Sequence, residues 1–269
     1  METLQQFEGL ESKVIVLVVH GAGEHIGRYQ HIADWFNQHQ YIMVGGDLPG
    51  LGKSKEKRGH IEYFDDYLKK VNQWLEYVKQ KWPELPIFLL GHSMGGLIVL
   101  RFIQELKEKE QQIKGIILTS PALSMKLEVP QWQIQVANFL HNFWPSFTMK
   151  NNIQPYQVSR DPKIIEQYGE DPLVYNKVSI RWFFQFKEAM KQVWSQRDQI
   201  NKQGLPILFL QAGEDLLVLP EKATDFVSKI NSELIEYHII PELYHEILNE
   251  PEKEIYLELI TNWIEKKRE

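Results

Sequence analysis

The sequence predicts a doubly wound α/β fold: a mostly parallel sheet covered by helices on both faces, with a helical segment inserted between two strands. Short apolar runs recur along the chain and end in turns that carry Gly, Ser or Pro. Most of them lack polar alternation, which is typical of strands buried on both faces of a parallel sheet. Segments with helical spacing lie between these runs. Such alternation favours a parallel sheet with right-handed crossovers.

Six apolar runs are the expected strands. They are Val14–Val19, Ile42–Val44, Ile87–Leu90, Ile116–Leu118, Ile207–Leu210 and Leu234–Ile240. The clearest helix is predicted over 64–78, where apolar side chains follow the i, i+3, i+4, i+7 pattern. Further helices are predicted over 97–106 and 255–263. The longest apolar run is strand-sized, well below the roughly 20 residues that a membrane-spanning helix needs.

Residues 121–204 interrupt the alternation and are predicted to form a helical cap on a core made of 1–120 and 205–269. We expect no strand in this segment. Between Val129 and Ser159 the only formally charged side chain is Lys150. A strand-to-helix loop of an α/β sheet tolerates such an insertion. Two interpretations stay open: the aromatic side chains only pack the cap onto the core, or they form an apolar wall over a hydrophobic substrate.

The composition excludes several classes of function. The chain has 269 residues, with 30 Lys and Arg against 36 Asp and Glu, so we expect no nucleic-acid partner. Cysteine is absent, which excludes disulfides, thiolate metal sites and a cysteine nucleophile. Residues 1–13 hold three acids and no basic region ahead of an apolar stretch, so we expect no secretory signal and a cytoplasmic protein.

The sharpest local motif is Gly91–Gly96, with the sequence GHSMGG. It follows an expected strand and opens an expected helix, which is the context of a nucleophile elbow. In such an elbow the hydroxyl of Ser93 projects above the sheet edge. The helix N-terminus supplies N–H groups and partial positive charge to an oxyanion. The alternative is a Gly-rich turn in which the serine only caps the helix.

A serine nucleophile needs a base, and the base needs an orienting carboxylate. Asp215 is the candidate acid, because it lies in the turn after an expected strand, where functional groups collect in open α/β sheets. The adjacent Glu214 stays open as a competitor. His245 is the candidate base, since it follows the last strand in the chain order Ser, acid, His. His238 lies inside that strand and is interpreted as a packed or edge histidine.

A second Gly-rich turn, His20–His25, follows the first expected strand. It can present a backbone N–H to an oxyanion, although an ordinary strand-to-helix turn is the alternative. His20 and His25 lack a third ligand at suitable spacing, so we expect no metal. The glycines of 46–54 lack the spacing of a phosphate-binding loop and are expected to serve turn geometry.

Five stretches together resemble the monoacylglycerol lipase and lysophospholipase branch of the α/β-hydrolases, in particular its bacterial, Bacillus-type members. They are His20–His25, Gly46–Ser54, Gly91–Gly96, the pair Ser159–Pro162 and Asp171–Leu173, and Tyr244–Glu246. The resemblance implies an α/β-hydrolase fold. It also implies that Ser93 is the nucleophile, Asp215 the acid and His245 the base, with the backbone N–H groups of Ala22 and Met94 as the oxyanion hole.

Larger members of this branch place a strand pair before the first parallel strand. Only about a dozen residues precede it here, so we expect a shortened antiparallel edge.

The resemblance implies a serine esterase of single-chain glycerolipids that needs no cofactor. A lysophospholipase or a short-chain carboxylesterase is the nearest alternative. A peptidase and a non-catalytic binding protein of the same fold are more remote, and the full Ser, Asp and His set argues against the latter. Trp132, Phe139, Phe143 and Trp144 are the expected substrate-binding residues of the cap. The expected partners are a small lipid ester and, transiently, a membrane surface or lipid micelle.

Overall fold

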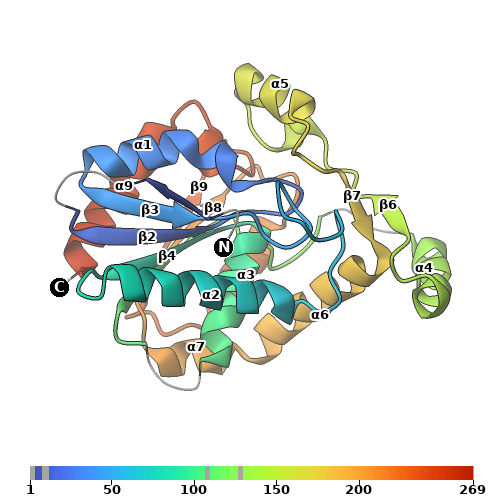
Figure 1. The fold of residues 1–269 in the computed structure, drawn as a ribbon, viewed down its shortest axis with the longest axis horizontal. Helices are drawn as coiled ribbons and strands as arrows, with labels where there is room; N and C mark the ends of the chain where they lie inside the picture. The colour runs from blue at the N-terminus through green and yellow to red at the C-terminus, as the bar shows by residue number, and fades with distance from the viewer. Residues whose placement is uncertain (1–3, 8–11, 107–109, 127–129, 269) are drawn as a thin grey trace.

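A seven-stranded sheet forms the centre of the molecule (Figure 1). The computed structural model describes residues 4–7, 12–106, 110–126 and 130–268. The strand order is β1-β3-β2-β4-β5-β8-β9. These strands are β1 (Gln5–Phe7), β2 (Val14–Val19), β3 (Tyr41–Gly45), β4 (Ile87–His92), β5 (Ile113–Thr119), β8 (Ile207–Ala212) and β9 (Ile235–Ile240). All neighbouring pairs are parallel except β1 with β3. The predicted fold class is confirmed.

The antiparallel edge of the sheet is the three-residue strand β1. It pairs with β3 in the register Gln5↔Gly45, Gln6↔Val44 and Phe7↔Met43. Residues 1–3 and 8–11 of the expected edge lie outside the described residues.

Side chains of β2 alternate between two apolar cores, one on each face of the sheet. Ile15 and Leu17 lie in one core, and Val14 and Val16 lie in the other. All four are fully buried, which explains why this run shows no polar alternation. Helices cover both faces (Figure 1). On one face lie α1 (Gln30–Gln38) and α9 (Lys253–Lys267), and on the other α2 (Asp65–Lys81), α3 (Met94–Glu105) and α8 (Pro220–Val227).

Segment 121–204 contains a small second sheet, so the prediction that it holds no strand is wrong. β6 (Thr148–Lys150) and β7 (Lys177–Ser179) pair antiparallel. Each has three residues and includes a lysine, too short and too polar to give a strand pattern. Around them lie α4 (Gln131–Phe143), η2 (Pro155–Gln157) and α5 (Pro162–Glu170), with α6 (Ile180–Ser195) directly after β7. Residues 127–129 lie outside the described residues.

The two ends of this segment differ in position. α4, α5 and the β6–β7 pair lie beyond one end of the main sheet (Figure 1). α7 (Arg197–Gln203) instead packs beside α3, in the helix layer that covers the sheet. There Gln203 Nε2 donates to the carbonyl of Leu106 at 2.8 Å, and Arg101 donates to Gln196 at 2.6 Å.

Candidate active site

Ser93 lies on a strained turn between β4 and α3. Its φ of 52° and ψ of −117° are costly for a residue with a side chain. The motif glycines permit this turn because no Cβ fits at their positions. A Cβ at Gly95 would lie 1.9 Å from the carbonyl oxygen of Val19, and one at Gly91 would lie 2.6 Å from that of Gly95. The strand, turn and helix therefore form the geometry of a nucleophile elbow.

Ser93, His245 and Asp215 form a continuous hydrogen-bonded chain. Ser93 Oγ lies 2.8 Å from His245 Nε2, and His245 Nδ1 lies 2.8 Å from Asp215 Oδ2. An ionised carboxylate only accepts, so Nδ1 carries a proton and Nε2 is left to accept from the serine hydroxyl. The three residues follow β4, β8 and β9. The carboxyl ends of parallel strands meet at one edge of the sheet, which brings them together.

The carboxylate of Asp215 is buried and held from several sides. Its Oδ1 accepts from the backbone N–H groups of Leu217 at 2.8 Å and Val218 at 3.0 Å. Burial alone would raise the pKa of Asp215. The charge of His245 and these hydrogen bonds outweigh burial and hold that pKa below its usual value. Glu214 is exposed, so the geometry favours Asp215 over its neighbour.

His245 is buried in a negative environment. Burial alone would lower the pKa of His245, but the charges of Asp215, Glu246 and Glu24 raise it above the usual value. The ring of His92 lies 5.0 Å from that of His245. Burial and the neighbouring His245 lower the pKa of His92. Neutral His92 bonds the carbonyl and hydroxyl oxygens of Thr119, each at 3.1 Å.

Ala22 and Met94, the residues expected to form the oxyanion hole, both lie close to Ser93: Met94 follows it in the chain, and a Cβ at Gly21, next to Ala22, would lie 3.3 Å from Ser93 Cβ. Ala22 lines the cavity onto which Ser93 and His245 open. Met94 is the first residue of α3, where an N–H group has no partner within the helix. Across the described residues, neither backbone N–H has a protein acceptor. This arrangement can stabilise an oxyanion.

The other histidines of the Gly-rich turn form structural hydrogen bonds. His20 Nε2 accepts from the backbone N–H of Leu48 at 3.0 Å, and its Nδ1 donates to the carbonyl of Gly21 at 2.9 Å. His25 Nε2 lies 2.8 Å from Asp171 Oδ2. Thus His20 joins two turns of the core, whereas His25 joins the core to segment 121–204. In the part of the chain that the structure describes, no group of three His, Cys, Asp or Glu could hold a metal ion.

The loop 46–54 is organised by Asp47. This carboxylate accepts from the backbone N–H groups of Ile26 at 2.9 Å and Lys53 at 2.7 Å. Gly50 and Gly52 adopt φ values of 77° and 53°, in the left-handed region that favours glycine. The prediction that these glycines serve turn geometry is confirmed.

His238 lies on β9, the edge strand of the sheet. It is partly exposed, and its Nε2 lies 3.0 Å from Glu236. The prediction of an edge histidine is confirmed.

Ser93 and His245 open onto a cavity of about 320 Å³, here called the catalytic cavity. Its wall is largely apolar. It is formed by Met125, Pro130, Met149, Ile153, Val178, Trp182, Phe183, Phe186, Leu217 and Val218. The polar lining includes Ser124, Lys150 and the amides of Asn151 and Asn152. The cavity therefore combines a nucleophile with an apolar wall of the kind that accepts a hydrocarbon chain.

The aromatic wall does not come from the expected residues. Trp132, Phe139, Phe143 and Trp144 do not line the catalytic cavity and are 64%, 65%, 76% and 58% exposed. The depletion of charge around them marked an apolar stretch but could not say which way its side chains point.

Helix α6 supplies the aromatic wall instead. Trp182, Phe183 and Phe186 are 6%, 8% and 6% exposed. The rings of Trp182 and Phe186 stack with centroids 4.8 Å apart. The buried side chains of α6 recur with helical spacing, and this was the signal in the sequence that could have identified them.

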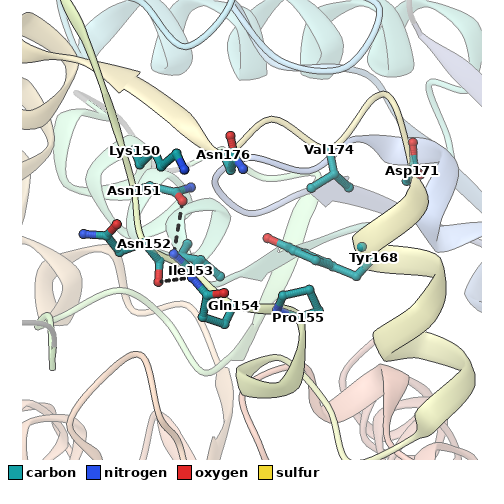
Figure 2. A pocket seen from close by; sticks show the side chains of 11 residues that line it. Lys150, Asn151, Asn152, Ile153, Gln154, Pro155, Tyr168, Asp171, Val174 and Asn176 are labelled. Carbon is teal, nitrogen blue, oxygen red and sulfur yellow. Dashed lines mark hydrogen bonds between the residues drawn. The ribbon is translucent and has the colours of Figure 1, made fainter.

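Figure 2 shows the lining of a second cavity of about 270 Å³, here called the polar cavity. The loop 150–153 lines both cavities. Tyr168 of α5 points its ring toward this loop and is only 7% exposed. Amide side chains of Asn151, Asn152, Gln154 and Asn176 complete the polar lining. Nothing in the sequence pattern indicated this cavity, because its residues come from α5 and from the segments on both sides of it.

Comparisons with known proteins agree with this fold. Residues 11–252 match the family described as serine aminopeptidase, S33. The chain is 33% identical to Phospholipase YtpA of Bacillus subtilis over 89% of this chain and 90% of that protein. It is 28% identical to a monoacylglycerol lipase of Mycolicibacterium smegmatis, over 93% of this chain and 87% of the relative. The crystal structure of a Paleococcus ferrophilus monoacylglycerol lipase matches with a TM-score of 0.85 and 28% identity, over 99% of this chain and 100% of that one. The chain belongs to the serine aminopeptidase S33 family and is an α/β-hydrolase.

Proposed function

We propose that this protein is a serine esterase that releases the fatty acid from single-chain glycerolipids. The observation that carries this proposal is the hydrogen-bonded chain from Asp215 through His245 to Ser93, which opens onto a cavity with an apolar wall. In the proposed reaction Ser93 attacks the ester carbonyl while His245 takes its proton. His245 then protonates the leaving alcohol, and water hydrolyses the acyl-enzyme. Names of relatives, a phospholipase and monoacylglycerol lipases, support the lipid substrate.

The remaining polar groups have roles that follow from this chemistry. Asp215 holds the imidazole of His245 in the tautomer that accepts from the serine. The N–H groups of Ala22 and Met94 stabilise the negative oxygen that forms when the carbonyl is attacked. These roles are carried by the chain's own side chains and backbone, with water as the second substrate.

The acyl chain is proposed to lie along the apolar wall of the catalytic cavity, with residues 121–204 acting as a cap over it. Burial of each methylene group contributes about 0.8 kcal/mol, so eight methylenes contribute roughly 6 kcal/mol before ordering costs. We therefore expect kcat/KM to rise from acetyl to medium and long acyl monoesters. Diacyl and triacyl substrates should be poor, since a capped cavity has room for one chain.

The head group is proposed to face the polar cavity, where amides and the buried Tyr168 can hydrogen-bond hydroxyl groups. A neutral glycerol head is the first candidate. Lys150 favours a second candidate, a lysophospholipid, because this lysine lines both cavities. Within the described residues its ammonium group has no ion-pair partner, and it could bind a phosphate.

Contact with a lipid surface is a further part of the proposal. The four exposed aromatic side chains at 132, 139, 143 and 144 lie on or next to α4. Aromatic and apolar side chains of this kind bind at a membrane interface or a micelle. No described helix is long and apolar enough to cross a membrane. We propose a cytoplasmic enzyme that touches lipid surfaces only to collect its substrate.

The central experiment is fluorophosphonate labelling followed by a substrate panel. Wild-type protein should be labelled at Ser93, and Ser93→Ala should not. Rates would then be measured on monoacylglycerols and lysophosphatidylcholines of increasing acyl length, with nitrophenyl esters and nitroanilide amides beside them. Flat or falling rates with chain length would leave a small-ester carboxylesterase, and faster amide cleavage would indicate a peptidase.

The head group is tested by Lys150→Met with Lys163→Met as the control. Lys163 is an exposed lysine of α5 outside both cavities. If the substrate carries phosphate, Lys150→Met should lower kcat/KM for the lysophospholipid about tenfold and leave the monoacylglycerol unchanged. Equal effects on the two substrates would reject the phosphate-binding role.

A further inference from the structure

A buried cluster of two carboxylates and one guanidinium lies beside the catalytic residues without being part of the proposed chemistry. It consists of Glu24, Arg28 and Glu246, whose side chains are 4%, 9% and 6% exposed. Arg28 Nη1 donates to Glu24 at 2.7 Å, and its two terminal nitrogens donate to both carboxylate oxygens of Glu246 at 2.7 Å each. Two parallel bonds from one guanidinium fix direction as well as distance.

One end of the cluster holds the turn that carries Ala22. Glu24 Oε1 accepts from the backbone N–H of Gly21 and from the hydroxyl of Tyr29. Gly21 packs so closely against the elbow that a Cβ there would lie 3.3 Å from Cβ of Ser93. The position of Glu24 therefore sets the position of the proposed oxyanion turn relative to the nucleophile.

The other end holds the loop that carries His245. Glu246 is the next residue in the chain, and its carboxylate also accepts from Asn249 at 2.7 Å. Its backbone N–H donates to the carbonyl of Val158 in segment 121–204 at 2.7 Å. The ring of Tyr168 in that same segment lies 4.8 Å from the Arg28 guanidinium. Thus Arg28 contacts three parts of the chain that meet only in the folded state.

We propose that Arg28 is a positioning residue for the ester hydrolysis proposed above. Its guanidinium joins the turn of Ala22 to the loop of His245, and so it holds the oxyanion donor of Ala22 and the base at their working separation. It touches neither the substrate cavity nor the reacting atoms. Burying a charged triad is favourable only when every member is paired. This explains why Arg28 has an acceptor on both sides.

The cluster also sets the charge around His245. The charged and titratable groups that face this ring come from four elements. They are Asp215 after β8, Glu246 on its own loop, Glu24 after β2 and His92 on β4. Burial would raise the pKa of Glu24, but Arg28 and the nearby histidines lower it to about 2. Arg28 therefore offsets carboxylate charge that would otherwise further favour the protonated imidazole.

The effect of these charges on the pKa of His245 gives a test that distinguishes a positioning role of Arg28 from a merely structural one. His245 must be neutral to accept the serine proton, so kcat/KM falls as the pH drops below its pKa. This decline is the acid limb of the pH profile. Glu246→Gln removes a negative charge and should move the acid limb roughly 0.5 pH unit lower. Arg28→Gln removes the positive charge and should move it roughly 0.5 pH unit higher. The double variant Arg28→Gln with Glu246→Gln should return the limb close to that of the wild type.

The proposed positioning role of Arg28 gives a second readout, the rate of turnover. Arg28→Gln should lower kcat/KM about 10- to 100-fold, mainly through kcat, because misplacement by about 1 Å costs this much. Arg28→Lys keeps the charge but loses the paired bonds. It should therefore retain the wild-type acid limb with an intermediate rate. Glu246→Gln keeps its shape and one acceptor oxygen, so it tests the charge effect even if Arg28→Gln fails to fold.

The matched control is Arg101→Gln. Arg101 is a buried arginine near the end of α3, paired with Glu105 far along the helix from Ser93. This variant should lose thermal stability and keep the wild-type acid limb. Acid limbs that move in the same direction in both single variants, or not at all, would overturn the inference while leaving Ser93 labelling intact. Wild-type protein that fails to label at Ser93 would overturn the proposed function, and this inference with it.

Discussion

The floor and the wall of the catalytic cavity are built by different means. The floor consists of the proposed catalytic groups, and each has a fixed hydrogen-bond partner. Ser93 is hydrogen-bonded to His245, and His245 to Asp215, whose carboxylate also accepts from two backbone N–H groups. The wall from α6 is instead held by packing, with Trp182 and Phe186 stacked and buried. Hydrogen bonds are directional and fix the positions of the reacting atoms, whereas apolar packing requires only complementary shapes.

Within segment 121–204 a second contrast appears. Trp182, Phe183 and Phe186 on α6 are buried, whereas the aromatic side chains at 139 and 143 on α4 are exposed. Aromatic side chains of one segment therefore form two surfaces, one facing the cavity and one facing outward. This difference predicts that changes on the floor abolish turnover, changes on the inner wall alter chain-length preference, and changes on the outer face alter only lipid contact.

Removal of the proposed nucleophile, Ser93, should have the largest effect on turnover. We expect Ser93→Ala to lower kcat by 10⁴-fold or more and to abolish fluorophosphonate labelling, because no other hydroxyl lies on the elbow. Circular dichroism and thermal melting should show a folded protein, since the change removes one hydroxyl group and leaves the apolar cores intact. Activity above a few per cent in a preparation free of wild-type enzyme would contradict the assignment.

Asp215→Asn should cost nearly as much. An amide at this position cannot hold His245 in the right tautomer, and a loss of about 10⁴ in kcat is known for such a change in a serine protease. Glu214→Gln is the matched control, one residue away and exposed, and should change kcat less than about threefold. Reversal of the two effects would assign the acid to Glu214.

The inner wall should control acyl length. Phe183→Ala removes a buried aromatic side chain and should lower kcat/KM for long-chain monoesters about 10- to 100-fold, with little change for acetyl esters. Phe139→Ala is a change of the same size on the exposed face. It should leave the dependence of kcat/KM on acyl length within twofold of that of the wild type. If both variants flattened the dependence on chain length, the wall would extend to α4 in solution.

The outer face should have the smallest effect on dissolved substrates. Phe143→Ser is expected to leave kcat/KM for a water-soluble nitrophenyl ester unchanged. On vesicles or micelles it should weaken binding a few-fold, because one exposed aromatic contributes roughly 1 kcal/mol or more at an interface. Cosedimentation with vesicles measures this directly, and Tyr63→Ser on the exposed start of the α2 region is the control. Equal losses in both variants would reject a lipid-contact face on α4.

The sequence by itself determined the parallel sheet, the elbow and the chain order of the catalytic candidates. These features depend on local patterns. An apolar run such as Val14–Val19 has no polar alternation because both of its faces are buried. The glycines of 91–96 are required because their backbone packs where no Cβ fits. Both leave a mark within a few consecutive residues of the chain, and this mark can be read without the fold.

Only the tertiary structure decided which carboxylate meets His245, which aromatic side chains face the cavity, and that Arg28 links two loops. Asp215 and Glu214 are neighbours with the same chemistry, and the backbone turn alone makes one buried and the other exposed. Arg28 and Glu246 are 218 positions apart. The physical reason is that periodicity records whether a side chain is buried, but not what buries it. That information exists only once strands and loops far apart in the chain have met at the same edge of the sheet.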